Sequence, residues 1–273
     1  MSFEWRPRHS EHAIEVMSLG IAFPEPLPVR LSQRLQQSVF SRMTADGDSI
    51  DRKVIRGIQV TNGAASFEQV GVQLSVPAEG HFAASTKLSS QVEINPQAII
   101  YRTWAYEKWD AELARMRAWM AEAIDLAASV SSIQSARLEY QDRFSYDGDV
   151  EDAPVAQLLR SDCMWLAPHI FSLREGWHSH TGRFIPSTHG QRSVVQLHVD
   201  VQDLPFPSPP GVRQTRWIYM MTAFEDRYDF TEIDPDGLNA DFLFERSTAM
   251  HHKLDDIIKQ ALTDEACAAI NLT

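Results

Sequence analysis

The sequence predicts an α+β fold, in which antiparallel sheets carry helices packed on one side. Three observations support this class. Apolar and polar residues alternate with the period of a β-strand in both halves of the chain. Long stretches over residues 106–128 and 242–261 repeat apolar residues with the period of an α-helix. The order of these runs is similar in the two halves, so we expect two successive β-α-β-β-β-α pseudo-repeats.

The first unit is expected to contain a strand, a helix, three or four strands and a long helix, at residues 15–23, 28–43, 53–60, 67–76, 82–102 and 106–128. Pro28 suits the start of the first helix, because proline is tolerated before the helical hydrogen bonds begin. Asn62-Gly63 is a strong hairpin signal between two strands. Val70, Val72 and Leu74 alternate with polar residues, which indicates a half-buried strand.

The second unit is expected to contain a strand, a short helix, three further strands and a helix, at residues 133–144, 154–160, 170–180, 194–201, 216–224 and 242–261. Residues 194–201 alternate cleanly between apolar and polar side chains. Residues 216–224 form an apolar run that is too short for a long helix and suits a central strand. Thr263 can cap one last short helix through Ile270.

The pseudo-repeats suggest a division into residues 1–130 and 131–273. The link between them, AASVS at residues 128–132, is short, which favours close packing over a flexible tether. A single continuous domain, with one mixed sheet built from both halves, is therefore an equal alternative. The composition suits a globular protein, because 44% of residues are apolar and 23% are charged, which excludes collagen, coiled coil and general disorder.

The formal net charge of −12 argues against non-specific nucleic-acid binding, because an acidic chain repels phosphate backbones. No phosphate-binding glycine loop, nucleophile elbow or H-E-x-x-H motif is present. These absences weaken several enzyme classes, but an enzyme built from scattered residues stays open.

We expect a cytoplasmic protein without a membrane partner. The cysteines, Cys163 and Cys267, are isolated, which fits a reducing compartment better than a disulfide scaffold. The first residues, MSFEWRPRHSEH, are polar and lack the apolar segment of a signal peptide. No stretch approaches the roughly 18 apolar residues that a membrane helix needs.

Histidines and an aspartate gather on two predicted strands, at His178, His180, His198 and Asp200. All four are even-numbered, whereas most of the apolar residues on these strands are odd-numbered, namely Phe171, Leu173, Trp177, Val195, Leu197, Val199 and Val201. A hairpin centred on Thr188 would place the four on one face, with His178 opposite His198. Imidazole and carboxylate groups suit zinc or iron, so these residues are candidate metal ligands.

Other interpretations of this face compete with a metal centre. Alternation of this kind is also the normal signature of a solvated sheet face. A third possibility is a concave face that binds a small anionic ligand, for which the candidates are Arg137, Glu139, Arg143 and Arg174. The His198-x-Asp200 pair with His251 matches part of the ligand pattern of 2-oxoglutarate dioxygenases, although no Arg-x-Ser follows His251. Of His251 and His252, we expect one to face the core edge and the other to face water.

Several landmarks together resemble a sporadically distributed family of prokaryotic proteins of unknown function. They are AFPEPLP after the opening strand, Tyr106 with Trp109 before a long helix, the strand ARLEYQDRF, the strand LHVDV, and His251 or His252 on a last helix before Thr-Asp-Glu. The chain departs from the family pattern at His198, where an acid is usual. The resemblance implies an α+β fold and brings no known catalytic residues. Its patchy distribution implies an association with defence systems or mobile genes.

The function that we expect from the sequence is that of a non-catalytic binding protein, with a protein partner inside a prokaryotic multi-protein system. One alternative is a metal-dependent enzyme at the His/Asp face. Another is a small-ligand-binding module at the arginine-rich strand. The sequence leaves open whether copies of the chain associate with one another.

Overall fold

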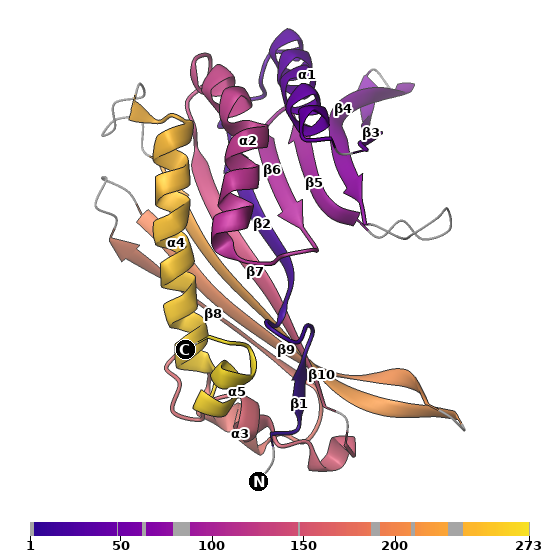
Figure 1. The fold of residues 1–273 in the computed structure, drawn as a ribbon, viewed down its shortest axis with the longest axis vertical. Coiled ribbons are helices and arrows are strands. Elements are labelled where there is room, and N and C mark those ends of the chain that lie inside the picture. Colours follow the sequence, from indigo (N-terminus) through magenta and orange to yellow (C-terminus); the bar gives the residue numbers. More distant parts are fainter. Residues whose placement is uncertain are drawn as a thin grey trace.

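The structure of the protein is a computed structural model, and it describes residues 3–47, 49–61, 64–78, 88–146, 148–186, 192–208, 211–228 and 237–272. A large antiparallel sheet carries the long helices on one of its faces (Figure 1). This arrangement confirms the α+β class that the sequence predicts. In the part of the chain that is described, no helix is long and apolar enough to cross a membrane.

The first half contains β1 (Trp5–Pro7), β2 (Ile14–Ala22), α1 (Val29–Ala45), β3 (Asp51–Thr61), β4 (Ala64–Pro77), β5 (Leu88–Asn95), β6 (Ala98–Thr103) and α2 (Trp109–Ala128). Among the described residues four strands lie between α1 and α2, which agrees with the three or four expected there but exceeds the three of a β-α-β-β-β-α unit. The identical β-α-β-β-β-α order in the two halves is not confirmed. The predicted turn at Asn62-Gly63 lies outside the described residues.

The second half contains β7 (Ser135–Tyr146), η1 (Val150–Asp152), α3 (Val155–Leu158), η2 (Pro168–Ser172), β8 (Trp177–Pro186), β9 (Arg192–Ser208), β10 (Gly211–Arg227), α4 (Ala240–Ala261) and α5 (Asp264–Ala269). Thr263 caps α5, because its side chain accepts a hydrogen bond from the Ala266 N–H, as the sequence predicts.

The strand expected over residues 170–180 is wrong in its first part. Pro168 opens a 3₁₀ turn in η2, and regular pairing starts only at Trp177. Just before it, Gly176 passes close to β9, where an added Cβ would lie 2.8 Å from the Val201 carbonyl oxygen. The chain therefore enters the sheet edge at a site that only glycine tolerates without a shift of the backbone.

The strand order is β3-β4-β5-β6-β2-β7-β10-β9-β8, and β1 pairs with β7 off this path. In the first half β2 pairs with β6, and in the second half β7 pairs with β10. The strands β2 and β7 then pair with each other, antiparallel, over residues 14–22 and 135–142. This pairing joins both halves in one sheet.

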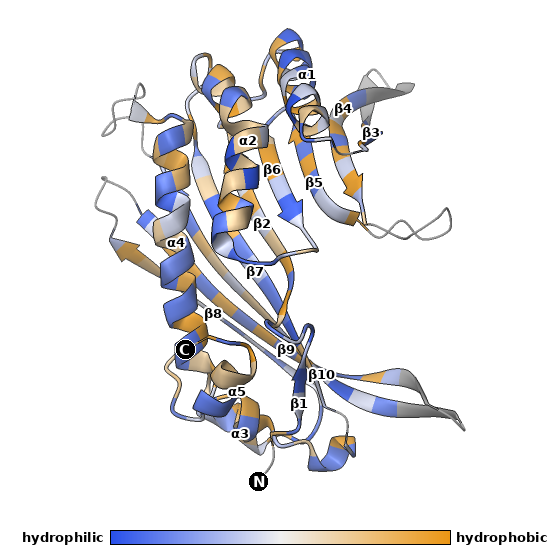
Figure 2. Ribbon diagram, in the orientation of Figure 1, coloured by the Kyte–Doolittle hydropathy of each residue, from blue (hydrophilic) through white to orange (hydrophobic). Residues whose placement is uncertain are grey.

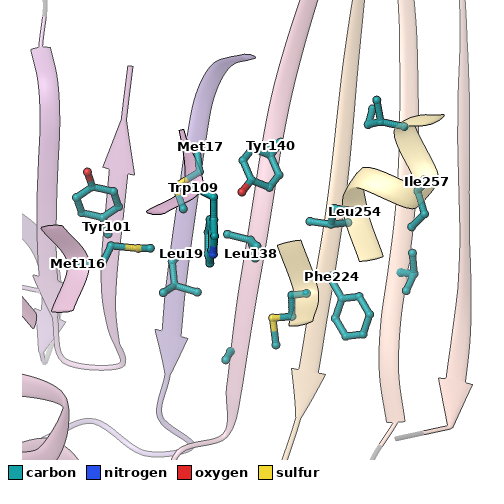
Figure 3. Packing of buried hydrophobic residues seen from close by; sticks show 14 of the residues in the cluster. Met17, Leu19, Tyr101, Trp109, Met116, Leu138, Tyr140, Phe224, Leu254 and Ile257 are labelled. Carbon is teal, nitrogen blue, oxygen red and sulfur yellow. The ribbon is translucent and has the colours of Figure 1, made fainter. Parts of the chain in front are cut away.

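The core lies between the sheet and the helices. Apolar and polar residues alternate along the central strands (Figure 2), so that one face of the sheet is apolar. Leu19 of β2 and Leu138 of β7 are fully buried on this face, next to Trp109 at the start of α2 (Figure 3). The even-numbered residues of β7 and β10 and the odd-numbered residues of β9 point the same way. The odd-numbered residues of β7 and β10 and the even-numbered residues of β9 face away from the helices.

A buried ion pair connects α4 to the sheet. Asp226 of β10 is 1% exposed and accepts two hydrogen bonds from the Arg246 guanidinium, at 2.9 and 2.6 Å. Its second oxygen accepts a hydrogen bond from the Ser193 hydroxyl of β9. Because the carboxylate is held by both partners, α4 is fixed in position along β9 and β10.

We predict that Arg246→Met lowers the free energy of unfolding by about 3 kcal/mol or more, because it leaves the Asp226 carboxylate buried without its counter-ion. The measurement is urea unfolding followed by circular dichroism. Arg117→Met is the matched control. Its partner Asp241 has an 89% exposed side chain, and such a pair contributes less than about 1 kcal/mol. Equal losses in both variants would contradict the stabilising role of the buried pair.

Candidate functional site

The predicted His/Asp residues lie on the sheet face that points away from the helices. The strands β8 and β9 do pair, but His178 lies opposite Asp200 and His180 opposite His198. The expected pairing of His178 with His198 is therefore wrong. The register differs by two residues, and a shift of two keeps every side chain on its face. The four side chains consequently still share one surface.

The geometry of these four residues is that of stacked rings. His180 and His198 stack with their centroids 4.1 Å apart and their planes 14° from parallel. His180 Nε2 lies 3.3 Å from the Asp200 carboxylate. Among the described residues, three metal-binding atoms come within 4.8 Å of one another on α4 instead. The sheet-face metal site stays a prediction.

The candidate anion-binding residues are only partly brought together. Arg137 and Arg143 share the outer face of β7, but each already binds a carboxylate: Arg137 pairs with Glu139 at 2.9 Å and Arg143 with Glu15 at 2.9 Å. Arg174 lies in the segment between η2 and β8, where its carbonyl oxygen accepts a hydrogen bond from Arg216. An incoming anion would therefore compete with carboxylates that these arginines already hold.

His251 lies on α4, on the helix-bearing side of the sheet, so it cannot complete a ligand set with His198 and Asp200 on the opposite face. That part of the dioxygenase-like pattern is wrong, because a sheet separates the residues. The side chain of His251 is 13% exposed, and His252 is exposed. The expectation that one of the two faces the core edge and the other faces water is confirmed.

A cavity of about 310 Å³ opens where α4, the sheet and the C-terminal segment meet. Both halves of the chain contribute to its wall. The lining residues are Glu11, His12, Ala13, Ile14, Tyr106, Glu107, Lys108, Trp109, Tyr140, Asp142, Thr222, His251, Leu254, Asp255, Ile258, Ile270, Asn271 and Leu272. We call this cavity the α4 pocket. Its volume lies within the range of small-molecule sites.

Asp142 stands on the sheet side of the α4 pocket. It belongs to β7 and lies between Ile14 of β2 and Met220 of β10. The residue is 6% exposed, and no described residue donates a hydrogen bond to its carboxyl group. Burial, with a smaller contribution from Asp255, raises its pKa to about 7. A second unpartnered group, the Thr222 hydroxyl of β10, is fully buried and also lines the pocket.

His251 lies on the α4 side of the pocket and has contacts on both ring nitrogens and on its ring face. Its Nδ1 lies 3.0 Å from the Tyr140 hydroxyl, and its ring stacks on Trp109 with centroids 4.6 Å apart. Its Nε2 points to Asp255, at 3.5 Å. Burial lowers the pKa of His251 to about 4, so the imidazole is neutral at pH 7. Burial raises the pKa of Asp255 to about 6, against the opposing charge of Lys259.

The aromatic rings of Tyr106, Trp109 and Tyr140 form part of the remaining wall. Tyr106 meets Tyr140 edge to face, with ring centroids 5.8 Å apart. The Tyr106 carbonyl oxygen lies 2.8 Å from Nε2 of His12, which ties the segment before β2 to the segment before α2. Burial raises the pKa of both phenols, so they remain protonated hydrogen-bonding groups across the physiological range.

Sequence reasoning missed Asp142, Asp255 and Thr222. For Asp142 a signal exists, because it shares the parity of Leu138, Tyr140 and Phe144 and is thus a charged residue at a core-facing position. Charged residues are rarely buried without a partner. Asp255 carries a weaker signal, since it follows His251 by one helical turn on the same face.

Comparison with known proteins adds no relative to this geometry: no protein-family model matches the chain, and no curated protein matches it. The resemblance to a prokaryotic family therefore stays a prediction.

We predict that Asp142 makes the protein less stable as the pH rises. Its folded-state pKa of about 7 lies above the ordinary value of 3.8. The contribution of the protonated Asp142 to the free energy of unfolding is therefore fully present below about pH 4 and is lost as the pH rises through 7. Between pH 4 and pH 8, the free energy of unfolding of wild type should fall by up to roughly 4 kcal/mol more than that of Asp142→Asn. Urea unfolding at both pH values measures this difference.

Asp200→Asn is the control for the preceding prediction, because Asp200 is a partly exposed carboxylate on the outer sheet face. The free energy of unfolding of Asp200→Asn should change between the two pH values as that of wild type does. An equal decrease in wild type and in both variants would show that the Asp142 carboxyl group does not cause the pH dependence.

Proposed function

We propose that the protein binds a small organic molecule that carries a basic nitrogen, and that the α4 pocket is the binding site. The observation that supports this most directly is that Asp142, a residue only 6% exposed, lines the pocket and accepts no hydrogen bond from the described residues. A ligand N–H would supply a donor. A charged ammonium would supply the counter-ion as well.

The energetic argument is that a buried polar group without a partner is costly. Leaving such a group unpaired costs about 1–3 kcal/mol, and more if it is charged. A protein keeps an unpaired polar group where the group serves a function, because a ligand that pairs with it recovers the lost free energy. The Thr222 hydroxyl adds a second unpaired group at the same wall.

Charge decides the class of ligand. Glu11, Glu107, Asp142 and Asp255 line the pocket, against the single ammonium of Lys108. A cavity lined by one sign of charge concentrates ligands of the opposite sign. The rings of Tyr106 and Tyr140 favour the same choice, since aromatic faces attract cations.

The other sequence-based hypotheses stay predictions. A protein partner, a prokaryotic defence or mobile-gene system, a cytoplasmic location and pseudo-repeated halves are all compatible with the α4 pocket, and none is required by it. A non-catalytic binding role agrees with our proposal, with a small molecule in place of, or in addition to, a protein. The anionic ligand proposed for Arg137 and Arg143 is disfavoured by their existing carboxylate partners.

The proposal is tested with amines and their neutral isosteres. We expect benzylamine and 2-phenylethylamine to raise the melting temperature of wild type, and benzyl alcohol and 2-phenylethanol to raise it less. Asp142→Asn should lose the response to the amines because the carboxylate is gone, whereas Asp200→Asn should retain it. Equal effects of amines and alcohols on wild type, or an undiminished amine response in Asp142→Asn, would contradict the proposal.

The affinity for a permanent cation should increase with pH. Below pH 7 the Asp142 carboxyl is mostly protonated and neutral, and above pH 7 it is a carboxylate. We therefore expect the Kd of benzyltrimethylammonium to fall roughly tenfold or more between pH 5.5 and pH 8. Isothermal titration calorimetry measures this change. Asp142→Asn is the control, and a pH dependence of the same size in that variant would point to another group.

A further inference from the structure

We propose that α4 carries a site for a divalent transition-metal ion at the edge of the α4 pocket, with His251 Nε2, His252 and Asp255 as its ligands. Within the described residues, these three offer metal-binding atoms that all lie within 4.8 Å of one another. The site goes beyond the proposed function, because metal binding here needs neither Asp142 nor an organic ligand.

The spacing of the three residues suits one helix. Asp255 follows His251 by four residues and His252 by three, and both separations place side chains on neighbouring positions of a helix surface. The distance from His251 Nε2 to the Asp255 carboxylate is 3.5 Å. Two ligands of a tetrahedral ion, with bonds of about 2.0–2.1 Å, lie about 3.3–3.4 Å apart. This pair needs almost no movement to hold an ion.

His251 is oriented as a metal ligand usually is. Ligating histidines almost always use their second ring nitrogen in a hydrogen bond that fixes the ring. Here Nδ1 is engaged by the Tyr140 hydroxyl at 3.0 Å, and stacking on Trp109 restricts the ring further. Nε2 is thereby directed at Asp255, where the ion would lie.

His252 completes the set from the solvent side. It is exposed, so its side chain can turn toward the ion without disturbing the core, and its ring centroid is 5.4 Å from that of His251. Two imidazoles and one carboxylate suit zinc, cobalt or iron(II) better than magnesium or calcium, which prefer oxygen ligands. Three protein ligands leave a coordination position open, as in catalytic rather than structural sites.

The contrast with the outer sheet face strengthens the assignment. There, His180 and His198 stack face to face, so their ring nitrogens do not converge on one point. On α4 the side chains converge and one imidazole is oriented by a tyrosine. Both places carry histidines and an aspartate, which allows each to serve as the control for the other.

The test is a titration of the 273-residue chain, freed of metal by a chelator, with Co²⁺ and Zn²⁺. The visible absorption of bound Co²⁺ reports the number of ions and their geometry, and Zn²⁺ competition gives its affinity. We expect one equivalent of metal, and a Kd at least about tenfold higher in His252→Ala and in Asp255→Asn. His180→Ala on the outer sheet face is the matched control and should bind as wild type does.

The possible outcomes separate the two proposals. Absence of stoichiometric binding to wild type, or loss of binding in His180→Ala with retention in His252→Ala, would overturn the α4 site. His252 is exposed, so its variant is expected to fold, and the melting curve of the metal-free protein verifies this. Asp142→Asn should keep its metal affinity, so failure of the amine experiment and failure of the metal experiment are distinguishable.

Discussion

The pairing of β2 with β7 is the contact on which the rest of the molecule depends. It joins a strand of the first half to the first strand of the second half, and so makes one continuous sheet. Because the sheet is continuous, α2 and α4 lie on the same face and meet each other, as the hydrogen bond from Trp109 Nε1 to Thr248 shows. The α4 pocket opens at the end of this junction, with walls from both halves. Two separate sheets would form no such cavity.

The polar groups of the pocket are positioned by the most regular parts of the fold. Asp142 and Tyr140 belong to a central strand that is paired on both sides, and His251 belongs to a helix fixed by the Asp226–Arg246 ion pair. Sites on strands and helices hold their side chains more precisely than sites on loops. The carboxyl group of Asp142 therefore stays at the pocket wall, despite the cost of its burial.

Much of the architecture could be predicted from periodicity. The alternation of Val195, Leu197 and Val199 identifies a strand with one buried face, and the apolar stripe of Leu243, Met250 and Leu254 identifies α4. The strand expected over residues 170–180 was wrong at its start, because local apolar content cannot distinguish a 3₁₀ turn from an edge strand. The β8–β9 pairing was two residues away from the expectation, since a turn centre chosen from sequence does not determine the register.

The sequence by itself determined the α+β class, the face on which the residues of its alternating strands lie, and the separation of His251 from His252 into a more buried and a more exposed residue. Only the tertiary structure decided which residues form a site. Asp142 and His251 are more than 100 positions apart and lie on a strand and a helix, and no periodicity within one element reports which other element covers it. The same limit explains why the sequence indicates a site at His178, His180, His198 and Asp200. These residues alternate along two adjacent strands, where a local pattern is visible, whereas the α4 pocket forms only when the helices pack on the sheet.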